Sequence, residues 1–366
     1  MKSARSVRIF TGISIATLAI SAISALAFGT VSASITKIDA FAGIDKRPDK
    51  KSSAINYLLV GSDTREGLTK AELKELRVGS VATAAGKRSD TMLLVHISKA
   101  RDKAVLVSIP RDTFALIPAH VNKAGKTISA VHSKINSAFN WGGAPLLIQT
   151  IEEMTQLKID HYVEVNFAGF ARVIDSLGGI EVCTKKDIDD PKSHLVLPAG
   201  VHTLNGIEAL KYVRTREFDG LGDIGRMQRQ QAFMSSVLKK ATSAGVLLNP
   251  VTMTSFINSS LAAVTTDEGL KNSDLITLAK QMKSLATSNV RTLTVPLADL
   301  NYYSNGVTAA VLWDPVLAPE LWDRLREDRA VVDQVTASPS PSSTKSAKVE
   351  IVDKFKTRTA DDNICR

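Results

Sequence analysis

The sequence has little cysteine and little histidine, with two and six residues among 366. They form no CxxC pair and no His-rich cluster, which argues against a zinc site of the usual kind. One cysteine, Cys183, ends an apolar stretch, as small buried hydrophobes often do, and the other, Cys365, lies in a polar terminal segment. Because an even pair in an exported chain favours a disulfide, we expect a bridge between Cys183 and Cys365.

Charge is absent from residues 9–35, and this run is long enough to span a bilayer. Lys2, Arg5 and Arg8 precede it, which places the N-terminus in the cytoplasm and the body outside the cell. Residues 25–27, Ala-Leu-Ala, resemble a signal-peptide cleavage site, so a cleaved signal is the alternative. We expect an uncleaved single-pass anchor in the cell membrane, because the apolar run continues past that site.

The remaining composition is that of a globular protein, with 44% hydrophobic and 23% charged residues. A net charge of +9 and a pI near 9.4 suit nucleic acid, an anionic membrane or an acidic polymer as partner. The export signal argues against a DNA-binding regulator. Partners of an exported basic protein are therefore expected at the membrane or in the wall.

Four regions follow from these patterns. Residues 1–35 form the anchor, and residues 36–54, with Pro48 and several lysines, are predicted to be a polar juxtamembrane stalk. Residues 55–330 are predicted to form one domain without a second domain beyond Pro250. Residues 331–366 form a tail whose Pro/Ser-rich part, 337–348, is typical of segments that do not fold.

Three apolar runs, residues 55–60, 91–98 and 104–109, predict neighbouring strands. The last two are separated by five residues and predict a hairpin, and the first is expected to pair antiparallel beside it. Charged residues flank the ends that would then meet: Asp63, Arg88, Asp90 and Arg111. Such charges are often only solubilising caps, but two carboxylates among arginines at one edge of a sheet indicate a site.

Further strands and helices alternate along the chain. Strands are expected at residues 161–167 and 180–183 and at an edge position over 290–296, and helices at 145–157, 170–177, 251–263, 273–286 and 315–326. This alternation predicts an α/β or α+β fold, a mixed sheet flanked by helices.

Residues 210–231 concentrate basic and amide side chains. Residues 213–216 alternate like a short strand, which would place Arg214 and Arg216 on one face. After three glycines, a helix over 224–241 would make Arg226 and Gln230 neighbours at i, i+4. Guanidinium groups beside a helix N-terminus are typical of an anion clamp, whereas the plainer interpretation is a solvated basic helix.

Seven segments in register resemble one known family: NYLLVGSDTR, RSDTMLLVHIS, VLVSIPRDT, KINSAFNWGG, FAGFARVIDSLGGIEV, LPAGVHTLNGIEALKYVRTR and DIGRMQRQQ. Together they resemble the LytR-CpsA-Psr family of bacterial cell-wall glycopolymer ligases. The resemblance implies a membrane-anchored, extracytoplasmic phosphotransferase that moves a glycopolymer from a polyprenyl-pyrophosphate carrier to peptidoglycan. It also implies an apolar groove for the polyprenyl chain.

The resemblance also assigns roles to individual positions. Asp63 and Asp90 match the carboxylates that are associated with Mg²⁺. Positions that contact pyrophosphate are matched by Arg88, Arg111, Arg214, Arg216, Arg226 and Gln230. Either of two further carboxylates, Asp112 or Asp223, is a candidate general base. The apolar stripe Met227, Met234, Val237, Leu238 and Ala241 would border the lipid groove, although such a stripe is at least as often core.

A different class of function remains open. A non-catalytic anchored protein that binds anionic wall polymer or polyprenyl phosphate would use the same basic charge and apolar groove. The carboxylate pair distinguishes the two, because Asp63 and Asp90 would repel phosphate unless a cation lies between them.

Overall fold

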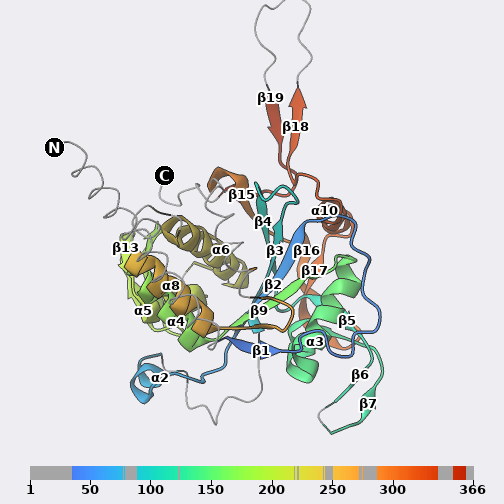
Figure 1. Cartoon of the computed structure of the whole chain (residues 1–366), viewed down its shortest axis with the longest axis horizontal. Helices are drawn as coiled ribbons and strands as arrows, with labels where there is room; N and C mark the ends of the chain where they lie inside the picture. Colours follow the sequence, from blue (N-terminus) through green and yellow to red (C-terminus); the bar gives the residue numbers. More distant parts are fainter. Residues whose placement is uncertain are drawn as a thin grey trace, which may run out of the picture.

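A computed structural model describes residues 35–76, 78, 89–122, 124–217, 219–220, 222–241, 243, 250–271, 274, 287–336 and 349–359. Its centre is a mixed sheet whose described strands follow the order β1-β14-β9-β2-β3-β4-β15-β20 (Figure 1). These strands are β1 (Thr36–Ile38), β2 (Ile55–Ser62), β3 (Ser89–Ile97), β4 (Ala104–Ile109), β9 (His161–Val165), β14 (Val264–Asp267), β15 (Val290–Thr294) and β20 (Arg358–Thr359).

Helices cover both faces of this sheet (Figure 1). On one side lie α3 (Asn136–Thr155) and α10 (Leu317–Arg326), and on the other lie α4 (Phe167–Ser176), α5 (Gly206–Arg214), α6 (Gly222–Ala241) and α8 (Pro250–Ala263). A short helix, α2 (Lys70–Leu76), follows β2. The predicted mixed sheet flanked by helices is confirmed.

The two faces of the sheet are packed differently. Leu58, Leu94 and Val107 face α3 and are fully buried. Their neighbours in sequence face the other helices, and Leu59 and Leu106 there are only half-buried. Strand residues alternate between faces, so one regular pattern produces a fully buried face and a looser one, on which buried Tyr57 and Ile97 lie among half-buried residues.

Smaller two-stranded sheets surround the main one. On the α3 side, β5 (Phe114–Ile117) pairs with β8 (Val131–Lys134), and β16 (Leu297–Ser304) pairs with β17 (Val307–Trp313). A bridge between Thr113 and Val311 joins these two pairs into one layer. The other pairs are β6 (His120–Val121) with β7 (Thr127–Ile128), β10 (Ile180–Thr184) with β13 (Gly200–Leu204), β11 (Ile188–Asp190) with β12 (Leu195–Leu197), and β18 (Asp333–Thr336) with β19 (Val349–Val352).

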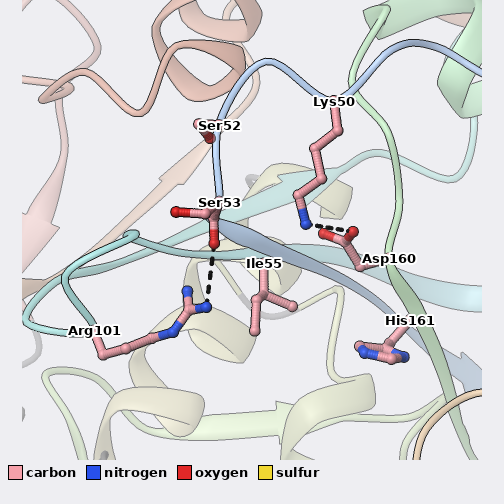
Figure 2. Close-up of a pocket in the computed structure, with 7 residues that line it drawn as sticks. All are labelled: Lys50, Ser52, Ser53, Ile55, Arg101, Asp160 and His161. Atoms are coloured by element: carbon pink, nitrogen blue, oxygen red, sulfur yellow. Dashed lines mark hydrogen bonds and ion pairs between the residues drawn. The ribbon is translucent and has the colours of Figure 1, made fainter.

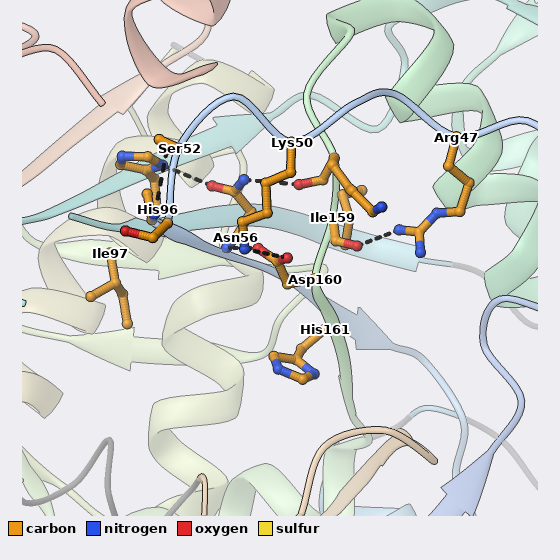
Figure 3. A network of polar contacts seen from close by, with 12 residues as sticks. Arg47, Lys50, Ser52, Asn56, His96, Ile97, Ile159, Asp160 and His161 are labelled. Carbon is orange, nitrogen blue, oxygen red and sulfur yellow. Dashed lines mark hydrogen bonds and ion pairs between the residues drawn. The ribbon is translucent and has the colours of Figure 1, made fainter. Parts of the chain in front are cut away.

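The predicted stalk is wrong, because residues 36–54 belong to the folded body. Strand β1 pairs parallel with β14, and Ala40 is fully buried. Arg47 donates hydrogen bonds to the buried carboxylate of Glu152 at 2.6 and 3.0 Å. It also donates to the carbonyl of Ile159 (Figure 3). A buried carboxylate requires such partners, so this segment is fixed to α3.

The C-terminal tail also returns to the body. Phe355 is buried in the main core, and β20 pairs with β15. Strand β15 therefore lies between β4 and β20, and the prediction that residues 290–296 form an edge strand is wrong.

Several predictions fall outside the described residues. They are the membrane span except Ile35, Cys365 of the expected disulfide, the Pro/Ser-rich stretch 337–348, the position of Arg88, and the helix at 273–286 except Asp274. Within the part of the chain that the structure describes, none of the helices combines the length and apolar character needed to cross a bilayer. The anchor and the disulfide stay predictions.

Replacing Arg47 tests the attachment of this N-terminal segment. The change Arg47→Ala leaves Glu152 buried without its cation, and we expect the free energy of unfolding to fall by about 3 kcal/mol. Chemical denaturation of the full chain measures this loss. The matched control is Lys46→Ala, which removes the same charge from an exposed neighbour. Equal stability of both variants would restore the stalk interpretation.

Candidate active site

Three strand ends meet at one edge of the main sheet, which we call the rim: the C-terminal ends of β2 and β4 and the N-terminal end of β3. Strand β3 pairs antiparallel with both neighbours, as predicted. The β2–β3 register shifts from Gly61↔Thr91 to Ser62↔Ser89. Asp90 is therefore the extra residue of a β-bulge in β3. Asp63 directly follows the partner strand β2, so the two aspartates lie beside each other at the ends of adjacent strands.

Arg111 follows β4 at the same rim. Its Nε lies 3.5 Å from a carboxylate oxygen of Asp112, whose other oxygen lies 3.4 Å from Nζ of Lys134. The backbone N–H of Asn136 donates to the carbonyl of Arg111. Thus the structure brings Asp63, Asp90 and Arg111 to one edge, while Arg88 lies outside the described residues.

Helix α6 lies along β4 and β15. The buried amide of Gln231 donates to Ser108 Oγ at 3.0 Å and to Thr294 Oγ1 at 2.9 Å, and further along the helix Leu238 packs near Leu106. The helix therefore runs antiparallel to β4. Arg226 lies five residues before Gln231, a rise of about 7.5 Å along the helix in the direction of the rim.

The predicted strand over residues 213–216 is wrong. Helix α5 begins with a capping box between Asn205 and Glu208 and continues to Arg214, and Thr215 ends it. The two arginines therefore come from a helix end and the turn that follows it. The Arg214 guanidinium lies 5.2 Å from the ring centroid of Phe167.

Two neighbouring side chains of α6 hold this turn. Gln230 donates to the carbonyl of Val213 at 3.0 Å, and Arg229 donates to the carbonyl of Thr215 at 2.6 Å and to the carboxylate of Asp219. Together with Gln231, they fasten the arginine-bearing turn to the sheet. The Gln230 side chain, predicted to contact pyrophosphate, here binds the backbone carbonyl of Val213.

Asp190 is a residue that the sequence analysis missed. Its buried carboxylate accepts the N–H groups of Arg216, Glu217, Lys192 and Ser193. Burial raises the pKa of this carboxyl, but the four donors outweigh burial and lower it overall. The signal was present in the sequence, because Asp-Pro at 190–191 is a turn-initiating pair.

A metal at the rim would have two carboxylates from the chain. Among the described residues, no group of three or more His, Cys, Asp or Glu side chains is arranged around a common point. Mg²⁺ is commonly held by one or two carboxylates together with substrate phosphates and water. The donor set of Asp63 and Asp90 fits this pattern.

A cavity of about 530 Å³ lies at the opposite end of the sheet (Figure 2). Its charged groups already bind protein: Lys50 pairs with Asp160 at 2.6 Å, Arg101 donates to the carbonyl of Ser53, and His161 faces Asp267. Because the charged groups of the cavity bind other groups of the protein, we do not assign it a ligand. The rim is therefore the candidate active site.

The LytR_cpsA_psr family matches residues 26–319 of the sequence. The chain belongs to this family. The resemblance found in the seven segments is thereby confirmed. The matched residues include the helices on both faces of the main sheet.

Relatives of known name match this chain over part of their length. A protein of Corynebacterium glutamicum named "Probable cell wall biosynthesis protein LcpB" is 36% identical over 275 residues, which cover 75% of this chain and 62% of that protein. The polyisoprenyl-teichoic acid–peptidoglycan teichoic acid transferase TagT of Bacillus subtilis is 35% identical over 204 residues, 54% of this chain and 56% of TagT. The chain thus spans less than two thirds of either relative.

Solved structures share the fold. A LytR-Csp2A-Psr enzyme from Actinomyces oris superimposes with a TM-score of 0.59 at 22% identity, covering 80% of this chain and 95% of that one. TagT bound to LI-WTA gives a TM-score of 0.56 at 28% identity, covering 81% and 98%. TagT bound to LIIa-WTA gives 0.56 at 26%, covering 79% and 98%.

Replacing Asp190 tests whether it holds the arginine turn. Because its folded pKa is lowered, the stability that it contributes is present above the unfolded pKa of about 4 and is lost as pH falls through the folded pKa. Asp190→Asn should lower the free energy of unfolding at pH 7 by about 1–3 kcal/mol and weaken its dependence on acid pH. Denaturation curves at several pH values measure both effects. The control is Asp189→Asn, the same change on an exposed neighbour. If the two variants behave alike, Asp190 does not have this role.

Proposed function

We propose that the protein is an extracytoplasmic phosphotransferase that moves a glycopolymer from a polyprenyl-pyrophosphate carrier to peptidoglycan through a phosphodiester link. The family membership and the transferase names of relatives such as TagT support this proposal. So do the titles of two TagT structures, bound to LI-WTA and to LIIa-WTA.

One observation carries the proposal. A β-bulge brings Asp90 beside β2, the strand that Asp63 directly follows, at the rim where Arg111 lies and toward which the start of α6 points. A passive anion site has no use for two carboxylates, because they repel phosphate. Carboxylates beside arginines suit a site that binds pyrophosphate together with a cation.

Asp63 and Asp90 would hold Mg²⁺, which, when bound, neutralises charge on the pyrophosphate oxygens. The remaining work belongs to the arginines. Arg226 at the start of α6 and Arg214 and Arg216 in the turn would bind the phosphates and stabilise the charge that develops on the leaving group. Arg111 would orient the transferred phosphoryl group from the rim.

The carrier lipid would lie on the looser face of the sheet. Leu59, Val95 and Leu106 are half-buried on this face. Leu238 of α6 belongs to the same cluster as Leu106 and is half-buried as well. This face leads directly to the arginines of α6. Of the predicted stripe on α6, Val237 and Ala241 pack against a core cluster, while Leu238 faces the sheet.

The position of β1 suits a substrate that lies in the membrane. Thr36 pairs with Thr265 near the rim, because β1 and β14 both run antiparallel to β2. An anchor over residues 9–35 would therefore join the body at the end of the sheet that carries the site.

The Mg²⁺ role predicts the loss of transfer in Asp63→Asn. The full-length protein is incubated with a lipid-pyrophosphate-linked glycan, peptidoglycan and Mg²⁺, and the linked product is quantified. Transfer should fall at least about 100-fold, as for loss of a group that stabilises transition-state charge. Chelator should abolish transfer by the wild type. Asp102→Asn, an exposed carboxylate at the other end of the sheet, is the control. Full activity of Asp63→Asn in chelator would remove the metal from the mechanism.

The lipid site predicts a dependence on carrier length. Each buried CH₂ contributes about 0.8 kcal/mol, so a donor whose prenyl chain is shortened by two isoprene units should show a KM raised more than about 10-fold. Steady-state kinetics in detergent measure the two donors at fixed acceptor. Equal KM values would place the prenyl chain outside the protein.

A further inference from the structure

Three half-exposed rings form a row on the outer side of the layer made by β8, β5, β17 and β16. The Phe114 ring stacks on His132 with centroids 5.0 Å apart and planes 9° apart. Tyr302 meets Phe114 edge-on at 5.1 Å. We call Phe114, His132 and Tyr302 the aromatic ledge.

Strand alternation directs the ledge outward. Ala115 and Ile117 point into the core below α3 and are buried, while Phe114 and Leu116 alternate with them. Leu116 is 46% exposed and lies opposite His132 in the register. The core therefore does not need the outer rings, and their half-exposed surface is available to a ligand.

The ledge is continuous with the rim. Phe114 is two residues after Asp112, and its register partner Lys134 binds Asp112 at 3.4 Å. The backbone N–H of Ile135 donates to the carbonyl of Thr113, which fixes β8 to the segment that leaves the rim. A ligand on the ledge would thus extend directly into the site.

The ledge and the proposed carrier site lie on opposite sides of the main sheet. The layer that bears the ledge packs on the α3 side, and the half-buried apolar face and α6 lie on the other (Figure 1). In phosphoryl transfer the attacking and leaving oxygens are roughly in line with phosphorus between them. With the leaving lipid phosphate on the α6 side, the attacking hydroxyl must arrive from the side of the ledge.

We propose that the aromatic ledge binds the sugar rings of the acceptor glycan strand and so guides its hydroxyl to the rim. This inference rests on the proposed function. Ring faces bind the apolar C–H faces of pyranoses, and the adjoining Lys134 suits acidic substituents on a wall glycan. Tyr302 and His132 act as specificity-determining residues for the acceptor, without a part in the chemical step.

Binding to a soluble glycan tests the ledge without reference to transfer. The full-length protein in detergent is titrated with an oligomer of β-1,4-linked N-acetylglucosamine by calorimetry. Loss of a ring contact in Tyr302→Ala should raise Kd about 10-fold, and His132→Ala should act in the same direction. Tyr302→Phe should bind like the wild type. The matched control is Tyr303→Ala, the exposed neighbour on the same strand. Thermal unfolding verifies that each variant is folded.

Kinetics separate failure of the ledge from failure of the proposed function. Tyr302→Ala should raise the acceptor KM and leave kcat and the donor KM unchanged. If Tyr302→Ala and His132→Ala bind the oligomer like the wild type while transfer proceeds normally, the ledge proposal is overturned and the transferase stands. If the oligomer binds through the ledge but no transfer occurs, the ledge holds and the transferase falls. Tyr302→Ala could also bind the glycan like the wild type while the protein changes from one association state to another. That result would assign the rings to contact with a second copy of the chain and overturn the proposal.

Discussion

The geometry of the rim depends on one buried amide. Gln231 reaches from α6 to Ser108 on β4 and to Thr294 on β15, and these two contacts fix how far the start of the helix projects past the strand ends. A buried amide without such partners would cost about 1–3 kcal/mol, so the sheet hydroxyls select one position of the helix. Arg226 and, through Arg229 and Gln230, the turn that carries Arg214 and Arg216 are then placed relative to the strands.

The arginine turn is held from two directions, and the two sets of contacts use different chemistry. From the α6 side, Gln230 and Arg229 donate to backbone carbonyls of the turn. From the β11 side, Asp190 accepts backbone N–H groups of Arg216 and Glu217. Backbone groups of the turn are thereby satisfied within the protein, so in the proposed function the anion would be bound by side chains. Such preorganisation lets charge stabilisation occur without reorganisation at the moment of reaction.

The sequence predicted the features that depend on local pattern. Apolar runs bounded by Gly and Pro gave β2, β3 and β4 within a few residues, and their short connection gave the antiparallel pairing that creates the rim. The stretch VRTR was misjudged because alternation over four residues fits a strand and a helix end alike. There the capping box at Asn205 and Glu208, three positions apart, was the better signal, since it starts a helix that continues to Arg214.

Other features depend on contacts between distant residues and leave no local signal. The segment 36–54 is polar and contains proline, yet it is part of the folded body. Arg47 donates a hydrogen bond to the buried Glu152, more than a hundred positions away, and β1 pairs with β14. β20 and Phe355 likewise join the body from a tail whose preceding residues are rich in Pro and Ser. Composition predicts whether a segment can build its own core, but it does not predict whether a core built elsewhere will accept that segment.

The unequal packing of the two sheet faces connects stability with function. Leu58, Leu94 and Val107 are fully buried under α3, and this face supplies the hydrophobic stabilisation expected of a core. Leu59, Val95 and Leu106 on the other face are half-buried, so they contribute less hydrophobic stabilisation than full burial would give. A sheet can tolerate one partly exposed face when the residues of the opposite face are fully buried, as they are under α3. In the proposed function, the apolar tail of the carrier would lie on this half-buried face and its charged head would lie at the arginines.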